Sequence, residues 1–193
     1  QAAVKRLRVQ ARQIFVYAKA ATMAGAGSND CFVQQAQTAL ANMQSRGWQP
    51  EGGWLHTFAA KGCAPNTMRD TYDHAFVLLS LAWVYRAAGD DQALVWARRT
   101  LGYLDAVLGD PVGGGYFEAV PGQSPRRANP HMHLLEALLA LFDASGDFTF
   151  LDRAGEIVNL FNRRFFDAKS GSVGEFFDPD WQPLAGKAGC LRE

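Results

Sequence analysis

Two of the four histidines lie close together, in the segment Ala128–Glu136, which ends with a glutamate. Asn129 is a good helix cap and the proline after it is favoured in a first turn, so we expect a helix to begin here. On a helix His133 and Glu136 share a face, whereas His131 points about 200° away from His133. His133 and Glu136 are therefore the pair that could act together.

An imidazole whose pKa is about 6.5 can take up and return a proton at neutral pH. A carboxylate one helical turn away can orient the ring or raise its basicity. The pair formed by His133 and Glu136 is therefore suited to removing a proton beside a carbonyl. The alternative is a solvated pair on a helix, which the spacing alone also allows.

The two neighbouring histidines and Glu136 also resemble the metal ligands of small barrel isomerases. That arrangement needs an extended strand, in which residues i and i+2 share a face. The proline and the apolar run Leu134–Leu141 favour a helix instead. We therefore expect no metal and no other cofactor.

Four more residues are candidates for a binding site, each with a structural alternative. His74 opens an apolar run, with Asp70 one turn before it, and a capped structural histidine explains this equally well. Arg12 is a charge in an apolar helix, and it either snorkels to the surface or faces a cavity and binds hydroxyl groups or an enolate. Trp54 and Tyr116 could stack on an apolar ligand face, although aromatic residues are more often part of the core. His56 has no partner pattern.

The elements that must position these residues repeat about every 60 residues. Three loops place glycine before aromatic residues, a pattern typical of a tight turn followed by a short strand. We expect each to form a small hairpin at one end of a helical pair. The loops are Gly52–Phe58, Gly113–Glu118 and Gly171–Phe177.

Strong helical patterns separate the loops, and Gly-Asp turns join the later helices in pairs. Their broad apolar faces predict an all-α toroid of helical hairpins. Three hairpins are an arc of a six-hairpin ring, and an open helical solenoid is the alternative. The predicted helices are Val4–Met23, Cys31–Ser45, His74–Ala87, Asp91–Val107, Pro130–Ala144 and Phe150–Arg164.

Composition limits the partners and the compartment. Lysine plus arginine equals aspartate plus glutamate at 19 each, which argues against nucleic acid and membrane surfaces as partners. Cys31, Cys63 and Cys190 lie far apart and predict neither a disulfide framework nor a thiolate metal site, which fits the cytoplasm. The longest apolar run is shorter than the roughly 20 residues that span a bilayer. The chain begins at Gln1 and not at a methionine, so we expect it to be cut from a longer one, and charges interrupt any stretch near Gln1 that could serve as a secretion signal.

Three ordered motifs resemble the N-acylglucosamine 2-epimerase superfamily, which includes mannose isomerases and cellobiose 2-epimerases on an (α/α)6 barrel. The motifs are Arg12-Gln-Ile-Phe, Tyr72-Asp-His-Ala-Phe and Asn-Pro-His-Met-His-Leu-Leu-Glu-Ala over 129–137. The resemblance covers essentially the whole chain and implies a single partial catalytic domain, residues 1–193.

The resemblance implies metal-independent proton transfer by His133, supported by Glu136, and by a second histidine much later in the family's sequence. Arg12, Trp54 and His74 would line the sugar site, and Asp70 and Asn129 would be further substrate contacts. A base removes the C2 proton of an open-chain aldose, and Arg12 or a protonated His74 stabilises the oxyanion of the enediol intermediate.

The motif around His133 looks most like the mannose isomerase branch, which implies aldose–ketose isomerisation of a monosaccharide; a homodimer is a compatible assembly. Family members continue into a Glu-Pro-Gly-His segment, of which Glu193 would be the first residue, so we expect this fragment alone to be inactive. The alternatives are a 2-epimerase of N-acylglucosamine or a glucose-containing sugar, a glycoside-processing enzyme with two carboxylates, and a non-catalytic helical repeat protein.

Overall fold

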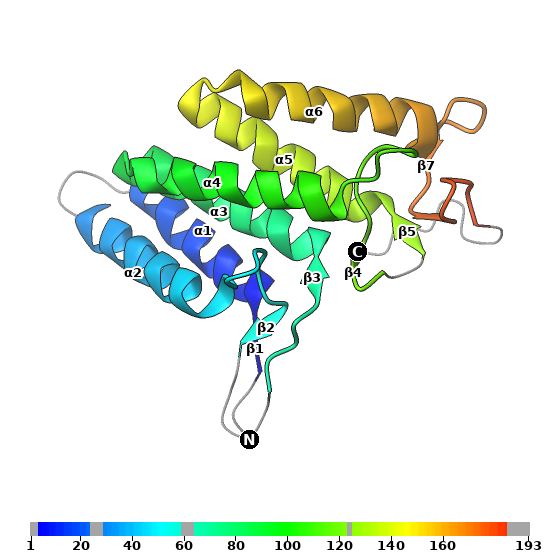
Figure 1. Ribbon diagram of the computed structural model, residues 1–193. Coiled ribbons are helices and arrows are strands. Elements are labelled where there is room, and N and C mark those ends of the chain that lie inside the picture. The colour runs from blue at the N-terminus through cyan, green and yellow to red at the C-terminus, as the bar shows by residue number, and fades with distance from the viewer. Residues whose placement is uncertain (1–3, 24–28, 59–63, 123–124, 185–193) are drawn as a thin grey trace.

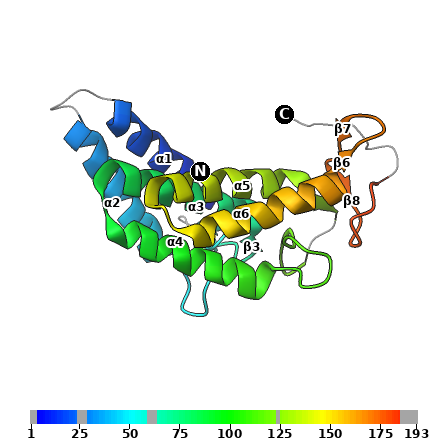
Figure 2. The ribbon, with the colours of Figure 1, turned by 90° about the horizontal axis from the view of Figure 1, so that it is seen from above.

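The computed structural model describes residues 4–23, 29–58, 64–122 and 125–184, arranged as two layers of helices (Figure 1). The inner layer contains α1 (Leu7–Met23), α3 (Thr71–Ala88) and α5 (Ala128–Ser145), which pack side by side. The outer layer contains α2 (Asn29–Gly47), α4 (Asp91–Tyr103) and α6 (Phe148–Leu160), each packed on the helix before it (Figure 2). One π-helical turn extends α4 and another extends α6, namely η1 (Leu104–Leu108) and η2 (Phe161–Phe165).

The Gly-Asp turns form as the sequence predicts. Gly89 and Gly146 end α3 and α5 with φ of 64° and 70°, in the left-handed region that favours glycine. The carboxylates of Asp90 and Asp147 then accept hydrogen bonds from backbone N–H groups of the next helix. The turns therefore reverse the chain and cap α4 and α6.

The glycine loops differ in part from the predicted hairpins. The first two close only through single bridges, Trp48 with Trp54 and Gly109 with Tyr116. Their short strands pair instead with the residues that lead into the inner helices, whose backbone groups need partners. Only near the third loop, among the described residues, do neighbouring strands form a hairpin, β6 with β7. The antiparallel pairs are β1 (Lys5–Arg6) with β2 (Thr57–Phe58), β3 (Arg69–Asp70) with β4 (Ala119–Val120), β5 (Arg126–Arg127) with β8 (Phe176–Phe177), and β6 (Phe166–Asp167) with β7 (Ser172–Val173).

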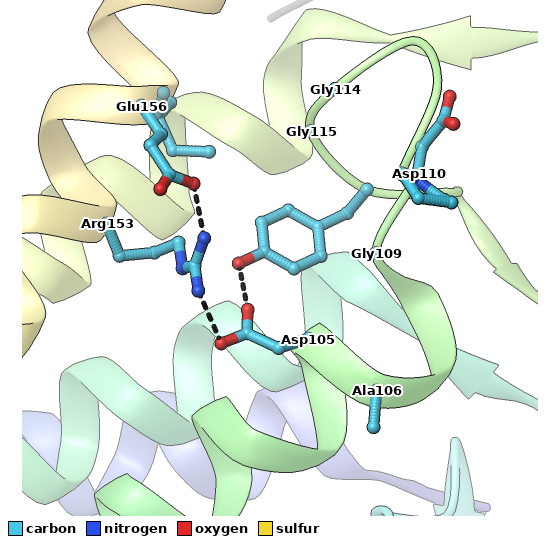
Figure 3. A pocket seen from close by; sticks show the side chains of 11 residues that line it. Asp105, Ala106, Gly109, Asp110, Gly114, Gly115, Arg153 and Glu156 are labelled. Carbon is cyan, nitrogen blue, oxygen red and sulfur yellow. Dashed lines mark hydrogen bonds and ion pairs between the residues drawn. The ribbon is translucent and has the colours of Figure 1, made fainter.

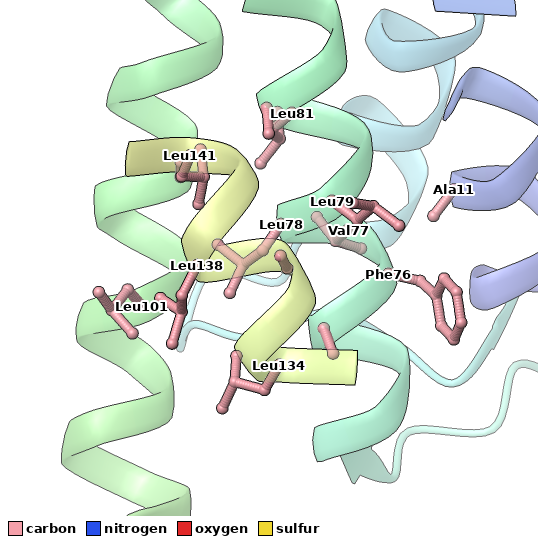
Figure 4. Packing of buried hydrophobic residues seen from close by; sticks show 14 of the residues in the cluster. Ala11, Phe76, Val77, Leu78, Leu79, Leu81, Leu101, Leu134, Leu138 and Leu141 are labelled. Carbon is pink, nitrogen blue, oxygen red and sulfur yellow. The ribbon is translucent and has the colours of Figure 1, made fainter. Parts of the chain in front are cut away.

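The main core lies around α3, because α1, α4 and α5 all pack on it. Leu78 and Leu81 of α3 are fully buried in one cluster with Leu134 and Leu138 of α5 and Leu101 of α4 (Figure 4). Burying a leucine side chain contributes about 2 kcal/mol, so this leucine layer holds the two helical layers together. None of the helices in the described ranges has the length and apolar character needed to cross a membrane.

Candidate active site

His133 and Glu136 contact each other, which confirms the pairing that their spacing predicts. Nδ1 of His133 lies 3.1 Å from Oε2 of Glu136 near the start of α5. Their side chains are 29% and 57% exposed, so both can be reached from outside. When Nδ1 donates its proton to the carboxylate, Nε2 is the ring atom that can accept one from a ligand.

Side chains from the two other inner helices surround this pair. The ring of Tyr72 meets His133 edge-on, with centroids 5.2 Å apart, and the Phe76 ring lies 4.7 Å away. Nη2 of Arg12, on α1, donates to the hydroxyl of Tyr72 at 2.9 Å, and the Arg12 guanidinium lies 4.0 Å from the Phe76 centroid. We call Arg12, Tyr72, Phe76, His133 and Glu136 the inner cluster.

The inner cluster contains a polar residue that sequence reasoning did not select. Tyr72 lies in one of the recognised motifs but received no role. A signal was available, because Tyr72 and Phe76 are four residues apart and so share a face of a helix. Their neighbour Arg12, for which the sequence left a surface and a cavity position open, is exposed and bonds Tyr72 from α1.

The structure corrects the predicted roles of Trp54 and His74, which are both 0% exposed. The backbone N–H of Trp54 donates to Nε2 of His74 at 3.2 Å, and Nδ1 of His74 donates to the carbonyl of Asp70 at 2.7 Å. The indole of Trp54 donates to Oγ1 of Thr100 at 3.0 Å. Burial lowers the pKa of His74 to about 4, so it is neutral at pH 7 and cannot serve as a cationic oxyanion donor. Both residues belong to the core.

Asp70 and Asn129 also lie at helix starts rather than in the inner cluster. Asp70 is buried, and its carboxylate accepts the backbone N–H of Asp73 at 3.0 Å, which caps α3. Asn129 was predicted to cap α5, but α5 begins at Ala128 and Asn129 is half-buried inside the first turn. The difference arises because β5 leads directly into α5, so that the helix starts earlier than the proline indicates.

His131 repeats the arrangement of His74 in the next hairpin. Its Nδ1 bonds the carbonyl of Arg127 at 3.0 Å, and its Nε2 accepts the backbone N–H of Tyr116 at 2.9 Å. Burial again lowers the histidine pKa to about 4. Tyr116 is itself buried, which corrects its predicted role in stacking on a ligand. We call each of these two arrangements a histidine latch. Because the segment is helical, His131 and His133 do not share a face as two ligands of one metal would.

Two cavities lie away from the inner cluster. The first, of about 490 Å³, is lined by the loop after η1 and by α6 (Figure 3). There the carboxylate of Asp105 accepts hydrogen bonds from Tyr116 at 2.6 Å and Arg153 at 2.8 Å, and Arg153 also pairs with Glu156. The second, of about 510 Å³, lies between η2 and the chain around Trp181. Neither cavity contains a residue of the inner cluster.

The fold is shared with solved sugar-converting enzymes. Cellobiose 2-epimerase from Bacillus thermoamylovorans B4167 superimposes with a TM-score of 0.83 over 94% of this chain and 50% of that chain, at 21% identity. This likeness shows the fold, and it confirms the all-α (α/α)6 class, of which this chain provides three hairpins.

Sequence comparison then gives the family. The model of the N-acylglucosamine 2-epimerase (GlcNAc 2-epimerase) family matches residues 1–192, so the chain belongs to this family. A relative in Rhizobium meliloti (strain 1021), named mannose-6-phosphate isomerase, is 33% identical over 98% of this chain and 49% of its own length. A Thermobifida fusca relative named D-mannose isomerase is 32% identical over 69% of this chain and 34% of its own length. The chain thus spans about half or less of the relatives it matches.

Proposed function

We propose that the whole protein isomerises an aldose to a ketose of the mannose and fructose type. The observation that supports this best is the inner cluster, where His133, held by Glu136, lies beside Tyr72 and Arg12 on one accessible face. The names of the Rhizobium and Thermobifida relatives agree with this reaction.

In the proposed mechanism, Nε2 of His133 or of a second histidine outside this chain takes the C2 proton of the open-chain aldose. The C–H electrons form the C1–C2 double bond, and the carbonyl electrons move to O1, giving an enediolate. The Arg12 guanidinium stabilises the charge that develops on O1. Protonation at C1, with transfer of the O2 proton to O1, then gives the neutral ketose. Asn129 remains a candidate for holding a sugar hydroxyl.

The alternative product is a 2-epimer, which forms when the proton returns to C2 from the opposite face. The cellobiose 2-epimerase fold likeness favours this second candidate. Both reactions share the same first step, so the inner cluster serves either outcome. Two other hypotheses are less well supported. A glycoside-processing enzyme needs two carboxylates, whereas Glu136 is the one carboxylate in the inner cluster. A non-catalytic repeat protein has no need for the contacts of Tyr72 with Arg12 and His133.

The test follows deuterium by NMR when the protein, with its natural flanking sequence, is incubated with mannose in D2O. We expect ketose formation with deuterium at C1, and loss of more than about a hundredfold in rate for His133→Ala. Asp143→Asn, which breaks only a surface pair with Arg86, is the matched control and should keep wild-type activity. Deuterium at C2 of glucose, the 2-epimer of mannose, would select the epimerase, and no exchange on any aldose would end the proposal.

We propose a monosaccharide as substrate, the cytoplasm as compartment and a homodimer as assembly. The family supports the substrate class, and the reduced, exposed Cys31 agrees with a reducing compartment. Cys63 and Cys190 lie outside the described residues. Size-exclusion chromatography with light scattering tests the assembly.

A further inference from the structure

A buried carboxylate lies directly behind the inner cluster, on α3. The side chain of Asp73 is 1% exposed, and its two oxygens have different partners. Oδ2 lies 2.6 Å from Nδ1 of His56, and Oδ1 lies 3.4 Å from Nη1 of Arg8. His56, unassigned from sequence, thus has a partner, and Asp73 joins α3 to the start of α1 and to the first loop.

Burial makes the charged form of Asp73 unfavourable, so packing alone does not explain its position. Desolvation, aided by the nearby charge of Asp70, outweighs the lowering by His56 and Arg8, so the pKa of Asp73 rises to about 6. An ion pair that chiefly stabilises a fold lowers the pKa of its carboxyl instead. Costly buried charges of this kind are found where geometry is needed for function.

Arg8 connects this carboxylate to the inner cluster. Its guanidinium lies 5.6 Å from the centroid of the Tyr72 ring, and that of Arg12, one turn later on α1, lies 5.9 Å from the same centroid. The Tyr72 ring also contacts the ring of His133, and the centroids of the two rings are 5.2 Å apart. A continuous set of contacts therefore runs from Asp73 through Arg8 and Tyr72 to His133.

We propose that Asp73 is a positioning residue of the sugar site: by holding Arg8 and His56, it fixes the Tyr72 ring against which His133 lies. This inference rests on the proposed function for its meaning in catalysis. Its geometric content, the dependence of the His133 ring on Asp73 through Arg8, stands without any substrate.

A purely structural role is the competing explanation. The carbonyl of His56 accepts the backbone N–H of Leu7 at 3.0 Å, so the His56 bond to Asp73 could simply anchor the start of α1. The two explanations differ at His133, which is on α5 and has no hydrogen bond or ring contact with His56 or Asp73. Only positioning through Arg8 and Tyr72 predicts an effect there.

The experiment measures the His133 ring resonances by NMR in Asp73→Asn, Arg8→Met and the control Asp90→Asn. Asp90→Asn removes the same charge from another helix start and leaves an equally good cap. We expect both Asp73→Asn and Arg8→Met to shift the His133 ring resonances, and the control to leave them unchanged. Unchanged His133 resonances in both variants would overturn the proposal. Arg8 is partly exposed, so Arg8→Met is expected to fold even if Asp73→Asn does not.

An activity assay then links the effect to turnover. We expect kcat of the full-length Arg8→Met protein to fall at least about tenfold with a displaced pH profile, because misplacement of a catalytic ring slows the reaction of bound substrate. A structural defect would instead reduce the folded fraction and leave the pH profile in place. If the His133 resonances shift but no variant or wild type exchanges deuterium into a sugar, positioning stands and the proposed function fails.

Discussion

The histidine latches predict that acid destabilises this protein through His131 and His74. The folded pKa of His131 is about 4, against 6.5 for the free side chain. Because the folded pKa is lowered, the stabilising effect is complete above pH 6.5 and is lost as the pH falls toward 4. Each pKa unit corresponds to 1.36 kcal/mol, so a fall from pH 6.5 to 4.5 removes roughly 3 kcal/mol per histidine.

The perturbation that isolates this effect is His131→Gln, which cannot titrate in this range. At pH 7.5 we expect the variant to be less stable than wild type by about 2 kcal/mol, because glutamine cannot both accept the Tyr116 N–H and donate to the Arg127 carbonyl as the ring does. At pH 4.5 that deficit should vanish or reverse, because only wild type loses roughly 3 kcal/mol of unfolding free energy by keeping the imidazole at position 131 neutral.

Urea unfolding followed by circular dichroism between pH 7.5 and 4.5 gives these free energies. Phe142→Leu is the control, because it destabilises the same helix without adding or removing a titrating group, and its deficit should stay constant with pH. A His131→Gln deficit that is equally constant would refute the assignment of His131 as a buried neutral latch.

Three further predictions concern other parts of the fold. The pKa of Asp73 is raised in the folded protein, to about 6 against 3.8, so its effect on stability runs the opposite way: wild type loses stability as the pH rises between these values. The stability of Asp73→Asn relative to wild type should therefore increase by up to roughly 3 kcal/mol from pH 4 to pH 7. The same series of unfolding measurements tests this. Gly115→Ala should destabilise the fold by about 3 kcal/mol, because Gly115 has φ of +71° and an added Cβ would lie 2.8 Å from Nε2 of His131. Gly89→Ala, with open space around the added Cβ, should destabilise it by about 1 kcal/mol. Equal losses of stability in thermal unfolding would contradict crowding at Gly115. Arg126→Met should cost about 3 kcal/mol, because it removes the buried guanidinium that pairs with the half-buried Asp110 carboxylate at 2.6 Å, and a loss below about 1 kcal/mol in urea unfolding would show that this pair does not stabilise the fold.

Most of the helical architecture follows from periodicity and turn chemistry. The predicted helix Asp91–Val107 corresponds to α4 with η1, and the Gly-Asp turns lie where the sequence places them. Helix starts were harder, because β3 and β5 lead straight into α3 and α5, and although Asp70 caps α3, no side chain caps α5. A two-residue strand has no periodicity to detect.

The candidate site was predictable where it depends on one helix and not where it depends on several. The three-residue spacing of His133 and Glu136 was enough to predict their contact. His74 looked similar in sequence, yet its partners are backbone atoms, including one on Trp54 twenty residues away, which leave no trace in side-chain spacing. The contact of Arg12 with Tyr72 joins residues sixty positions apart, so only the packing of α1 on α3 reveals it.

The histidine latches also define what can be exchanged between related proteins. Each of the first two loops bonds the inner helix of its own hairpin through a carbonyl, as His56 does with Leu7 and Glu118 does with Thr71, and donates an N–H to the histidine of the following hairpin. The segment that can be exchanged as one unit is therefore a loop together with the start of the next inner helix, and not a pair of helices. A chimera that joins a relative's loop to this chain should fold well only when the residue matching His74 or His131 is transferred with it.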